Sequence, residues 1–356
     1  MPEAREILIN GRFLGRRPTG VDRFAFELLR ALDDWLEERP HPTLRFRILV
    51  PQGVSARFRH LAVETCGRRQ GLLWEQLELP LAARGLPLLS LCNAAPLFKR
   101  QQIVTLHDAA PAQVPESYGR AFRLWYRLLM PWLGSIAPRV LTVSQFSARA
   151  IATAYHVRAD KIRVLAESGE HMLRVAADAG LLERHALLSR PYVLAVSSMV
   201  PHKGFATLVR AVELLGADCG FDVVIAGGTD PRIFAGASLP GFVRHVGYVT
   251  DGELRALYEH AACFVFPSYY EGFGLPAAEA MALGCPVIAA NAASIPEVCG
   301  SAARYFPAGD AQALSTLLQQ SLRDEAWLRA ARDRSLAQAT HWRWRDSASQ
   351  LLAALT

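Results

Sequence analysis

Two glutamates, Glu271 and Glu279, lie on either side of a glycine-containing turn in residues 268–286, which read SYYEGFGLPAAEAMALGCP. The apolar run at 263–266 predicts a strand before this turn, and Pro276 suits the first turn of a helix after it. The start of a helix presents unpaired backbone amides, and its dipole favours an anion there. The spacing therefore predicts two carboxylates that hold hydroxyl groups around a bound phosphate ester. Two solvated glutamates on a helix would give the same spacing, so the spacing alone leaves both interpretations open.

The whole stretch resembles the donor-site signature of the retaining family 4 glycosyltransferases, which have the two-domain GT-B fold, and the resemblance continues through 284–289 and 295–298. It implies that Glu271 lies against the transferred sugar and that Glu279 holds the ribose hydroxyls of a nucleotide-sugar donor. It also implies that backbone amides of the loop reach the sugar and the diphosphate. The donor-binding residues that it assigns to this loop are Glu271, Gly272, Phe273, Gly274, Leu275 and Glu279.

Apolar runs alternate with helix-like segments along the whole chain. Runs of four or five apolar residues without polar alternation are typical of strands that are covered on both faces. Their alternation with helices predicts an α/β protein with two doubly wound parallel sheets. The predicted strands lie at 7–9, 46–50, 88–91, 103–106, 140–143, 192–196, 223–226, 242–246, 263–266 and 287–290.

The segment 167–191 contains no strand-like run, which places a domain linker near 180–190. A chain of 356 residues usually forms more than one core. We therefore expect Rossmann-like domains over 1–185 and 186–340, and a final helix within 341–356. The resemblance to GT-B enzymes implies that the first domain binds the acceptor and the second binds the nucleotide sugar. It also implies that the two domains face each other across a cleft and that the final helix crosses back to the first domain.

Lys203 follows the predicted strand at 192–196 and is one of only three lysines in the chain. In the family this loop supplies an arginine and a lysine that clamp the diphosphate. Lys203 matches the lysine, whereas Ser198 stands at the position of the arginine. The resemblance therefore assigns both Lys203 and Ser198 to donor binding.

A second loop, after the predicted strand at 7–9, is rich in glycine and arginine. Glycines in such a loop can simply permit a tight turn, and the motif is only weakly specific. The resemblance implies that the loop adjoins the donor phosphates and the acceptor, with Gly20 on the donor side. It places three residues on the acceptor side, Arg16, Arg17 and Thr19.

His107 and Asp108 follow the predicted strand at 103–106, at the end of a parallel strand where ligands bind. Such a pair is often structural, because the aspartate caps a helix and the histidine bonds to backbone. The resemblance implies instead that His107 faces the donor sugar and is catalytic with Glu271 and Lys203, and that Asp108 lies on the acceptor side.

Two further turns resemble family segments that receive the nucleotide base, and they contain Gly228, Tyr248 and Val249. A purely structural turn would be compatible with the same residues. Ser144, after the predicted strand at 140–143, is expected to cap the following helix.

The net charge of +6 suits anionic ligands such as nucleotide sugars. No recognition helix or ribbon of stacked aromatic residues indicates nucleic acid as a partner. No Asp-x-Asp pair suited to a divalent metal is present, so neither a metal nor another cofactor is expected. The leaving diphosphate is then neutralised by Lys203, basic loop residues and helix N-termini. The six scattered cysteines are expected to be buried free thiols.

The expected activity is retaining, metal-independent transfer of a hexose from a nucleoside diphosphate sugar to an acceptor hydroxyl. The residues at 74–76, Trp-Glu-Gln, and the Lys203 loop without its arginine resemble those of bacterial mannosyl- and rhamnosyltransferases of surface polysaccharide assembly. GDP-mannose is therefore the expected donor, and a lipid-linked or free oligosaccharide is the expected acceptor. A GT-B sugar-nucleotide epimerase and a non-catalytic donor-binding subunit are the alternatives.

The stretch 118–139 combines four arginines with large apolar side chains, among them Phe122, Trp125 and Trp132. This composition is typical of an interfacial membrane contact, although a core helix with an arginine-bearing outer face would show it too. No run approaches the ~18 apolar residues of a membrane span, and the N-terminus lacks an apolar secretory segment. We therefore expect a cytoplasmic protein, peripheral on the cytoplasmic face of the inner membrane.

Overall fold

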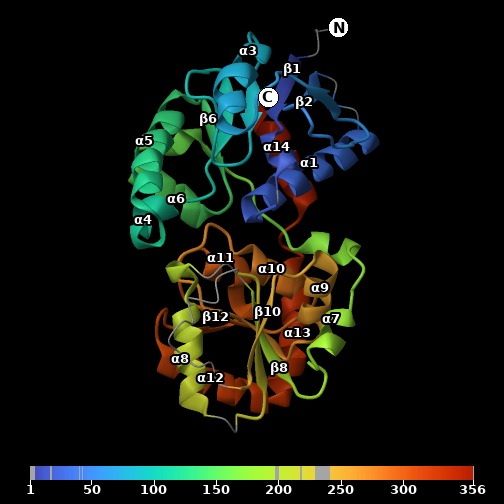
Figure 1. The fold of residues 1–356 in the computed structure, drawn as a ribbon, viewed down its shortest axis with the longest axis vertical. Helices are drawn as coiled ribbons and strands as arrows, with labels where there is room; N and C mark the ends of the chain where they lie inside the picture. Colours follow the sequence, from blue (N-terminus) through green and yellow to red (C-terminus); the bar gives the residue numbers. More distant parts are fainter. Residues whose placement is uncertain are drawn as a thin grey trace. The chain divides into compact units, whose positions relative to one another are not determined.

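The computed structural model describes residues 5–16, 18–39, 41, 43–196, 200–216, 219–228 and 241–355. The chain divides into two compact units, of which the first comprises residues 1–167 and 344–356 and the second comprises residues 168–343. Each unit contains one parallel β-sheet with helices packed on it (Figure 1). The expected pair of parallel α/β sheets is therefore confirmed.

The first unit is built on a seven-stranded sheet in the order β3-β2-β1-β4-β5-β6-β7. Neighbouring strands pair in parallel throughout, as where Ile7 aligns with Phe46. The strands are β1 (Arg5–Asn10), β2 (Leu44–Val50), β3 (Ala62–Thr65), β4 (Leu88–Ser90), β5 (Gln102–Thr105), β6 (Arg139–Thr142) and β7 (Ile162–Val164).

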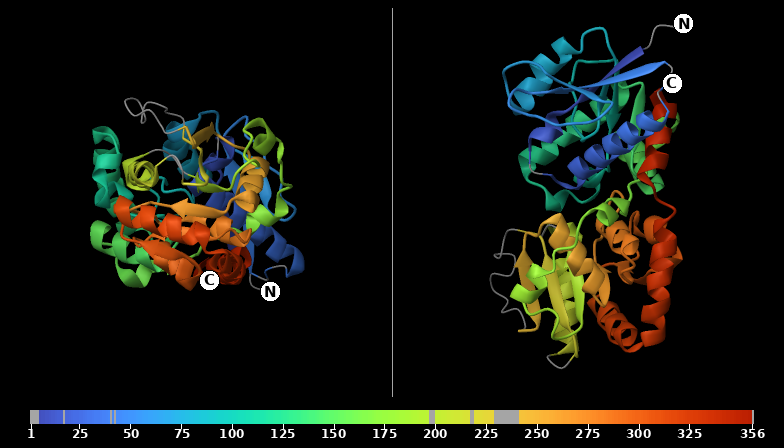
Figure 2. Two further views of the ribbon diagram at one scale, coloured as in Figure 1. Left: turned by 90° about the horizontal axis from the view of Figure 1, so that it is seen from below. Right: turned by 90° about the vertical axis from the view of Figure 1, so that its right-hand side faces the viewer.

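Two long helices, α5 (Arg120–Ile136) and α6 (Gln145–Tyr155), form a core with β5 and β6 through residues such as Leu133 and Ile151. Helix α1 (Gly20–Glu38) packs against α14 (Trp344–Leu355), so the last helix belongs to the first unit (Figure 2). The shorter helices are α2 (Gly71–Leu73), α3 (Leu79–Ala82) and α4 (Ala110–Gln113), and a π-helical turn occupies Trp74–Glu78.

The second unit is built on a six-stranded parallel sheet in the order β10-β9-β8-β11-β12-β13. Its strands are β8 (Tyr192–Val196), β9 (Asp222–Ala226), β10 (Val243–Gly247), β11 (Cys263–Phe266), β12 (Val287–Ala290) and β13 (Arg304–Phe306). Its helices are α7 (Gly180–Arg184), α8 (Phe205–Leu215), α9 (Asp251–His260), α10 (Leu275–Ala282), α11 (Ile295–Cys299), α12 (Ala311–Arg323) and α13 (Glu325–Ala339).

Alternate residues of the buried strands face opposite layers of helices. Cys263 and Val265 of β11 belong to the core that α8 and α12 cover. Phe264, between them, contacts the ring of Tyr258 on α9. Both faces of the central strands are therefore apolar, which explains why these strands appear in the sequence as unbroken apolar runs.

The boundary between the units falls after Glu167, earlier than the expected boundary at residue 185. The segment 168–184 contains no strand, as expected, but it packs on the second unit. A 3₁₀ turn at Glu170–Arg174 contacts α10, and α7 contacts α9. Arg255 of α9 also donates hydrogen bonds to backbone carbonyls of the segment. The absence of a strand-like run predicted a linker in this part of the sequence. It could not show which of the two units the segment packs on.

In each sheet the strand order reverses direction at one central pair, which is β1 and β4 in the first unit and β8 and β11 in the second. Ligands of open α/β sheets bind beyond the carboxyl ends of the strands at such switch points. The loops after these four strands are therefore the places where a functional site is expected.

Candidate active site

Lys203 and Glu271 meet at the switch point of the second unit. Lys203 lies in a 3₁₀ turn, Pro201–Lys203, after β8, and Glu271 lies in the loop after β11. The Nζ atom of Lys203 donates to both carboxylate oxygens of Glu271, at 2.9 Å each. The side chains are 19% and 10% exposed, so the ion pair is largely shielded from water. The two residues that the sequence singled out most strongly thus form one charge-neutral pair.

The two loops that carry this pair are locked together by backbone contacts. The amide of Tyr269 donates to the carbonyl of His202 at 2.8 Å. Gly204 has a positive φ of 70°, and a Cβ atom there would lie 2.0 Å from the carbonyl oxygen of Pro267. Only glycine permits so close an approach. The hydroxyl of Ser294 lies 3.0 Å and 2.8 Å from the carbonyl oxygens of Glu271 and Phe273, which anchors the acidic loop from the other side.

The acidic loop runs directly into the N-terminus of α10. Gly274 precedes the helix with a φ of 103°, in the left-handed region that favours glycine. Among the described residues, no group accepts a hydrogen bond from the amides of Phe273, Gly274 and Leu275. These amides and the helix dipole make the turn suitable for an anionic or strongly polar ligand group.

Glu279, on α10, is held by two residues that the sequence did not indicate. Its Oε1 atom lies 3.1 Å from Nε2 of His171, and its Oε2 atom accepts from the hydroxyl of Tyr258 at 3.2 Å. The other ring nitrogen of His171 lies 3.0 Å from the carbonyl oxygen of Ser168. The ring of His171 is therefore held between the backbone of Ser168 and the carboxylate of Glu279. Burial, reinforced by the charge of Glu279, raises the pKa of Tyr258 well above its usual value, so its hydroxyl stays a neutral donor.

The two turns predicted to receive a nucleotide base lie side by side. The amide of Gly227 donates to the carbonyl of Gly247 at 2.7 Å, which joins the ends of β9 and β10. Gly228 therefore lies near Tyr248 and Val249. Tyr248 is exposed and Val249 is buried, and their assignment to a base pocket stays a prediction. Ser198 lies outside the described residues.

In the first unit, Arg16 and Thr19 both bond to Asp22 of α1. The carboxylate of Asp22 accepts from Nε of Arg16 at 2.8 Å and from the Thr19 hydroxyl at 2.7 Å. This arrangement caps α1 and fixes the loop after β1. Gly20 is the first residue of α1 and is exposed. Arg17 lies outside the described residues, and the acceptor-side assignment of Arg16 and Thr19 stays a prediction.

His107 is buried in the first unit, after β5. Its Nε2 atom lies 2.9 Å from the carbonyl oxygen of Leu91, and its Nδ1 atom lies 3.7 Å from the carboxylate of Glu167. The ring of Phe24 packs edge-on against it. Contacts at both nitrogens favour a positioning role over proton transfer, and the catalytic assignment stays a prediction. Asp108 accepts from the amide of Ala110, the first residue of α4, at 2.8 Å.

A buried carboxylate also marks the switch point of the first unit, where β1 and β4 end. Glu75, in the π-helical turn, accepts from the side-chain amide of Asn10 at 2.8 Å and lies 3.2 Å from the guanidinium of Arg12. Burial raises the pKa of the Glu75 carboxyl despite the opposing effects of Arg12 and Asn10. The sequence drew attention to residues 74–76 only by resemblance and did not predict these contacts.

The described parts of both units contain no group of three or more His, Cys, Asp or Glu side chains arranged to hold a metal ion. The second unit brings together Lys203, Glu271 and the start of α10, and the first brings together Arg16 and Thr19.

Comparison with known proteins is consistent with this geometry. Residues 190–324, which include the acidic loop and Lys203, match the family model described as glycosyl transferases group 1. Residues 81–167 match the model described as glycosyltransferase family 4. The two matches fall on the second and first units, respectively.

Two curated relatives come from Escherichia coli. The O-antigen chain mannosyltransferase B is 34% identical over 264 residues, which cover 71% of this chain and 69% of the relative. The serotype-specific mannosyltransferase WbdA is 29% identical over 235 residues, which cover 62% of this chain but only 29% of the relative.

Two solved structures show the same fold over almost the whole chain. Sucrose-phosphate synthase from Thermosynechococcus elongatus superposes with a TM-score of 0.75 at 21% identity, covering 99% of this chain and 98% of that one. HepE from Anabaena, in complex with UDP and glucose, superposes with a TM-score of 0.74 at 17% identity, covering 99% of each chain. The expected GT-B fold class is confirmed. The match to the O-antigen mannosyltransferase covers more than two thirds of both chains, and residues 81–167 match the family 4 model. The chain therefore belongs to glycosyltransferase family 4.

Proposed function

We propose that this glycosyltransferase moves a mannosyl group from GDP-mannose to a hydroxyl of a growing, lipid-linked polysaccharide, with retention of anomeric configuration and without a metal ion. The observation that carries the proposal is the Lys203–Glu271 ion pair beside the open amides of α10. A sugar diphosphate needs a cation and free amides for its phosphates and a carboxylate for its hydroxyl groups. All of these groups lie at this one switch point. The names of the two Escherichia coli relatives support mannose as the sugar and O-antigen as the kind of product.

Donor binding exchanges the partners of the ion pair. A diphosphate takes hydrogen bonds from Lys203, whose ammonium group carries three donors. Glu271, released from part of its bond to Lys203, accepts from hydroxyl groups of the sugar. The amides of Phe273, Gly274 and Leu275 donate to the diphosphate or to the sugar. Because the ion pair is neutral as a whole, no buried charge is left without a partner before the donor arrives.

Glu279 holds the ribose of the nucleotide in this proposal. Each of its carboxylate oxygens has one protein partner, His171 or Tyr258, and each keeps a further lone pair for a ribose hydroxyl. The two partners fix the orientation of the carboxylate. His171 and Tyr258 are thus positioning residues for nucleotide affinity.

The reaction breaks the bond between C1 of mannose and the β-phosphate oxygen and forms a bond between C1 and the acceptor oxygen on the same face. The acceptor hydroxyl gives its proton to the departing phosphate oxygen, so no protein nucleophile is required. The charge that develops on the diphosphate is stabilised by Lys203 and by the N-terminus of α10. This neutralisation takes the place of a metal ion.

The bound ligands of HepE, UDP and glucose, support a nucleotide-sugar donor for this fold. Among the described residues, no side chain identifies the base, so guanine rests on the naming of the relatives as mannosyltransferases. A cytoplasmic location, where nucleotide sugars are made, completes the proposal.

A thermal-shift panel of GDP, UDP, GDP-mannose and UDP-glucose tests the donor. We expect the largest stabilisation from GDP and GDP-mannose, since a ligand that binds only the folded state raises the melting temperature. A preference for uridine nucleotides would exclude GDP-mannose, and no shift with any of the four would contradict the donor site itself. Incubation with GDP-mannose alone should yield no epimer, and formation of one would favour an epimerase.

A further inference from the structure

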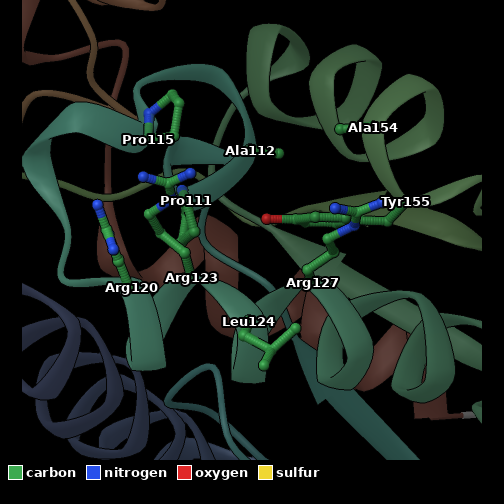
Figure 3. Close-up of a pocket in the computed structure, with 9 residues that line it drawn as sticks. All are labelled: Pro111, Ala112, Pro115, Arg120, Arg123, Leu124, Arg127, Ala154 and Tyr155. Atoms are coloured by element: carbon green, nitrogen blue, oxygen red, sulfur yellow. The ribbon is translucent and has the colours of Figure 1, made fainter.

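A cavity of about 440 Å³ lies on the first unit, and none of the residues assigned to the site above lines it. Its floor is α5, which contributes Arg120, Arg123 and Arg127, and its other walls come from the segment 111–115 and from α6. Figure 3 shows the arginine side chains rising from α5 and the phenol of Tyr155 pointing towards them from α6. A volume of this size suits a small ligand or head group.

The cavity is strongly cationic. The three arginines lie three and four residues apart on one face of α5, so their charges repel one another. Among the described residues, no carboxylate forms an ion pair with any of them. Asp108 is near enough to influence Tyr155, but it accepts from the backbone amide of Ala110. An anion in the cavity would relieve the repulsion between the arginines.

Tyr155 adds a directed hydrogen-bond donor to these charges. It is 4% exposed, and its hydroxyl has no hydrogen-bond partner in the described part of the chain. A buried hydroxyl without a partner is unfavourable, so the group is suited to a ligand that brings an acceptor. Burial raises the pKa of Tyr155, which keeps the phenol protonated as a donor. Three guanidinium groups and one neutral hydroxyl are together complementary to a phosphate group.

Large apolar side chains next to the arginines are exposed to solvent. Leu124, Trp125 and Leu128 of α5 are 61%, 42% and 64% exposed. They lie at helical spacing beside Arg123 and Arg127, so one side of α5 is cationic and the adjacent side is apolar. This combination is typical of helices that lie at a membrane interface. No helix in the described part of the chain is both long and apolar enough to cross a bilayer.

We propose that this cavity binds the phosphate of a membrane lipid while Leu124, Trp125 and Leu128 enter the bilayer at head-group depth. The inference rests on the proposed function, because it names the place where a lipid-linked acceptor is held by its phosphate. The occupant is a lipid phosphate and not a free anion, because the exposed apolar side chains beside the arginines on α5 have no role for a soluble ligand.

Vesicle co-sedimentation tests the proposal, with phosphatidylcholine vesicles that contain or lack phosphatidic acid as the probe. The wild-type chain should bind only the vesicles with phosphatidic acid, and binding should weaken with salt. The triple variant Arg120→Ala, Arg123→Ala, Arg127→Ala should bind about 100-fold more weakly, from ~1 kcal/mol for each arginine. A triple variant of exposed arginines elsewhere in the first unit, Arg30→Ala, Arg45→Ala, Arg84→Ala, is the matched control and should bind almost as wild type does.

Two further variants distinguish binding of a lipid phosphate in the cavity from general attraction of a basic protein to anionic vesicles. Tyr155→Phe removes one hydroxyl and should weaken binding about tenfold, as expected for a hydrogen bond to a charged group. Leu124→Ser, Trp125→Ser, Leu128→Ser should abolish sedimentation with vesicles while leaving nucleotide affinity unchanged.

Equal losses in the two triple arginine variants would overturn the proposal, as would wild-type binding by Tyr155→Phe. Competition by inorganic phosphate at the affinity of the lipid would overturn the choice of a lipid ligand. Nucleotide affinity, measured on the same samples, keeps the two proposals apart. A chain that binds GDP-mannose but no vesicles contradicts only the lipid site, whereas one that binds vesicles but no nucleotide contradicts only the proposed function.

Discussion

The ammonium group of Lys203 donates to both carboxylate oxygens of Glu271 at 2.9 Å, although the two residues follow different strands and lie 68 positions apart. We propose that Lys203 binds the diphosphate and that Glu271 binds the sugar. The two side chains thus neutralise each other when no nucleotide sugar is bound. The pair keeps both side chains in place and leaves neither charge buried alone. It also couples the two residues, so that loss of either one changes the other.

Glu271→Gln should therefore lower turnover by about two orders of magnitude or more, the typical cost of losing one positioned catalytic interaction. Lys203→Gln should lower kcat/KM to a similar degree. The double variant should lose less than the product of the two single losses, since residues in contact are not additive. Steady-state kinetics of the three variants provide the measurement. Glu325→Gln, at an exposed carboxylate on α13, is the control, and near-normal turnover of Glu271→Gln would contradict the assignment.

Glu279→Ala should weaken nucleotide binding by about 1–3 kcal/mol, because a hydrogen bond between ribose and a charged group is lost. His171→Ala should produce part of this loss without touching the nucleotide, since His171 orients the carboxylate. Isothermal titration calorimetry with GDP measures both. Unchanged affinity in Glu279→Ala would exclude the ribose role, and a full loss in His171→Ala with none in Glu279→Ala would reverse the two assignments.

Several parts of this site could be predicted from the sequence. The central strands of both sheets, such as β5 and β11, are buried on both faces and appear as apolar runs. The acidic loop and Lys203 follow such strands, so their places at the switch point could be inferred. Ser144 was expected to cap a helix, and its Oγ atom does accept from the amide of Ser147 at the start of α6.

Other parts could not be predicted because they depend on tertiary packing. The three strands that were missed, β3, β7 and β13, all lie at sheet edges and are short and partly exposed, so they lack an apolar run. His171 lies 108 positions from Glu279 in a segment without regular strands, and no local pattern connects the two. Residues 74–76 were noted only by resemblance, and no sequence pattern predicted that a π-helical turn places Glu75 between Asn10 and Arg12.

Glu75 should make the protein less stable as pH rises above the unfolded pKa of a glutamate, about 4.3. Burial raises the pKa of this carboxyl, so the folded state keeps its proton in a pH window where the unfolded state has lost it. In that window the free energy of unfolding falls with rising pH. Urea denaturation from about pH 4 to pH 7 should give a flatter pH dependence for Glu75→Gln than for wild type. Identical pH dependences would show that Glu75 does not titrate differently in the folded state.

Transfer activity should survive an excess of chelator with little change. The diphosphate is neutralised by Lys203 and by the amides at the start of α10, which are part of the chain itself. Initial rates with and without EDTA provide the measurement, and they are measured for wild type and for the Lys203→Gln variant. Loss of activity on chelation, restored by magnesium or manganese, would require a metal-dependent mechanism.

The configuration of the product tests the central claim most directly. Wild-type protein incubated with GDP-mannose, whose mannose is α-linked, and an oligosaccharide acceptor should yield an α-mannosidic linkage by NMR. Glu271→Gln should still bind GDP and should form this product at least about 100 times more slowly. A β-linked product, or an α-linked product formed equally fast by Glu271→Gln, would contradict retaining mannosyl transfer at the Lys203–Glu271 site.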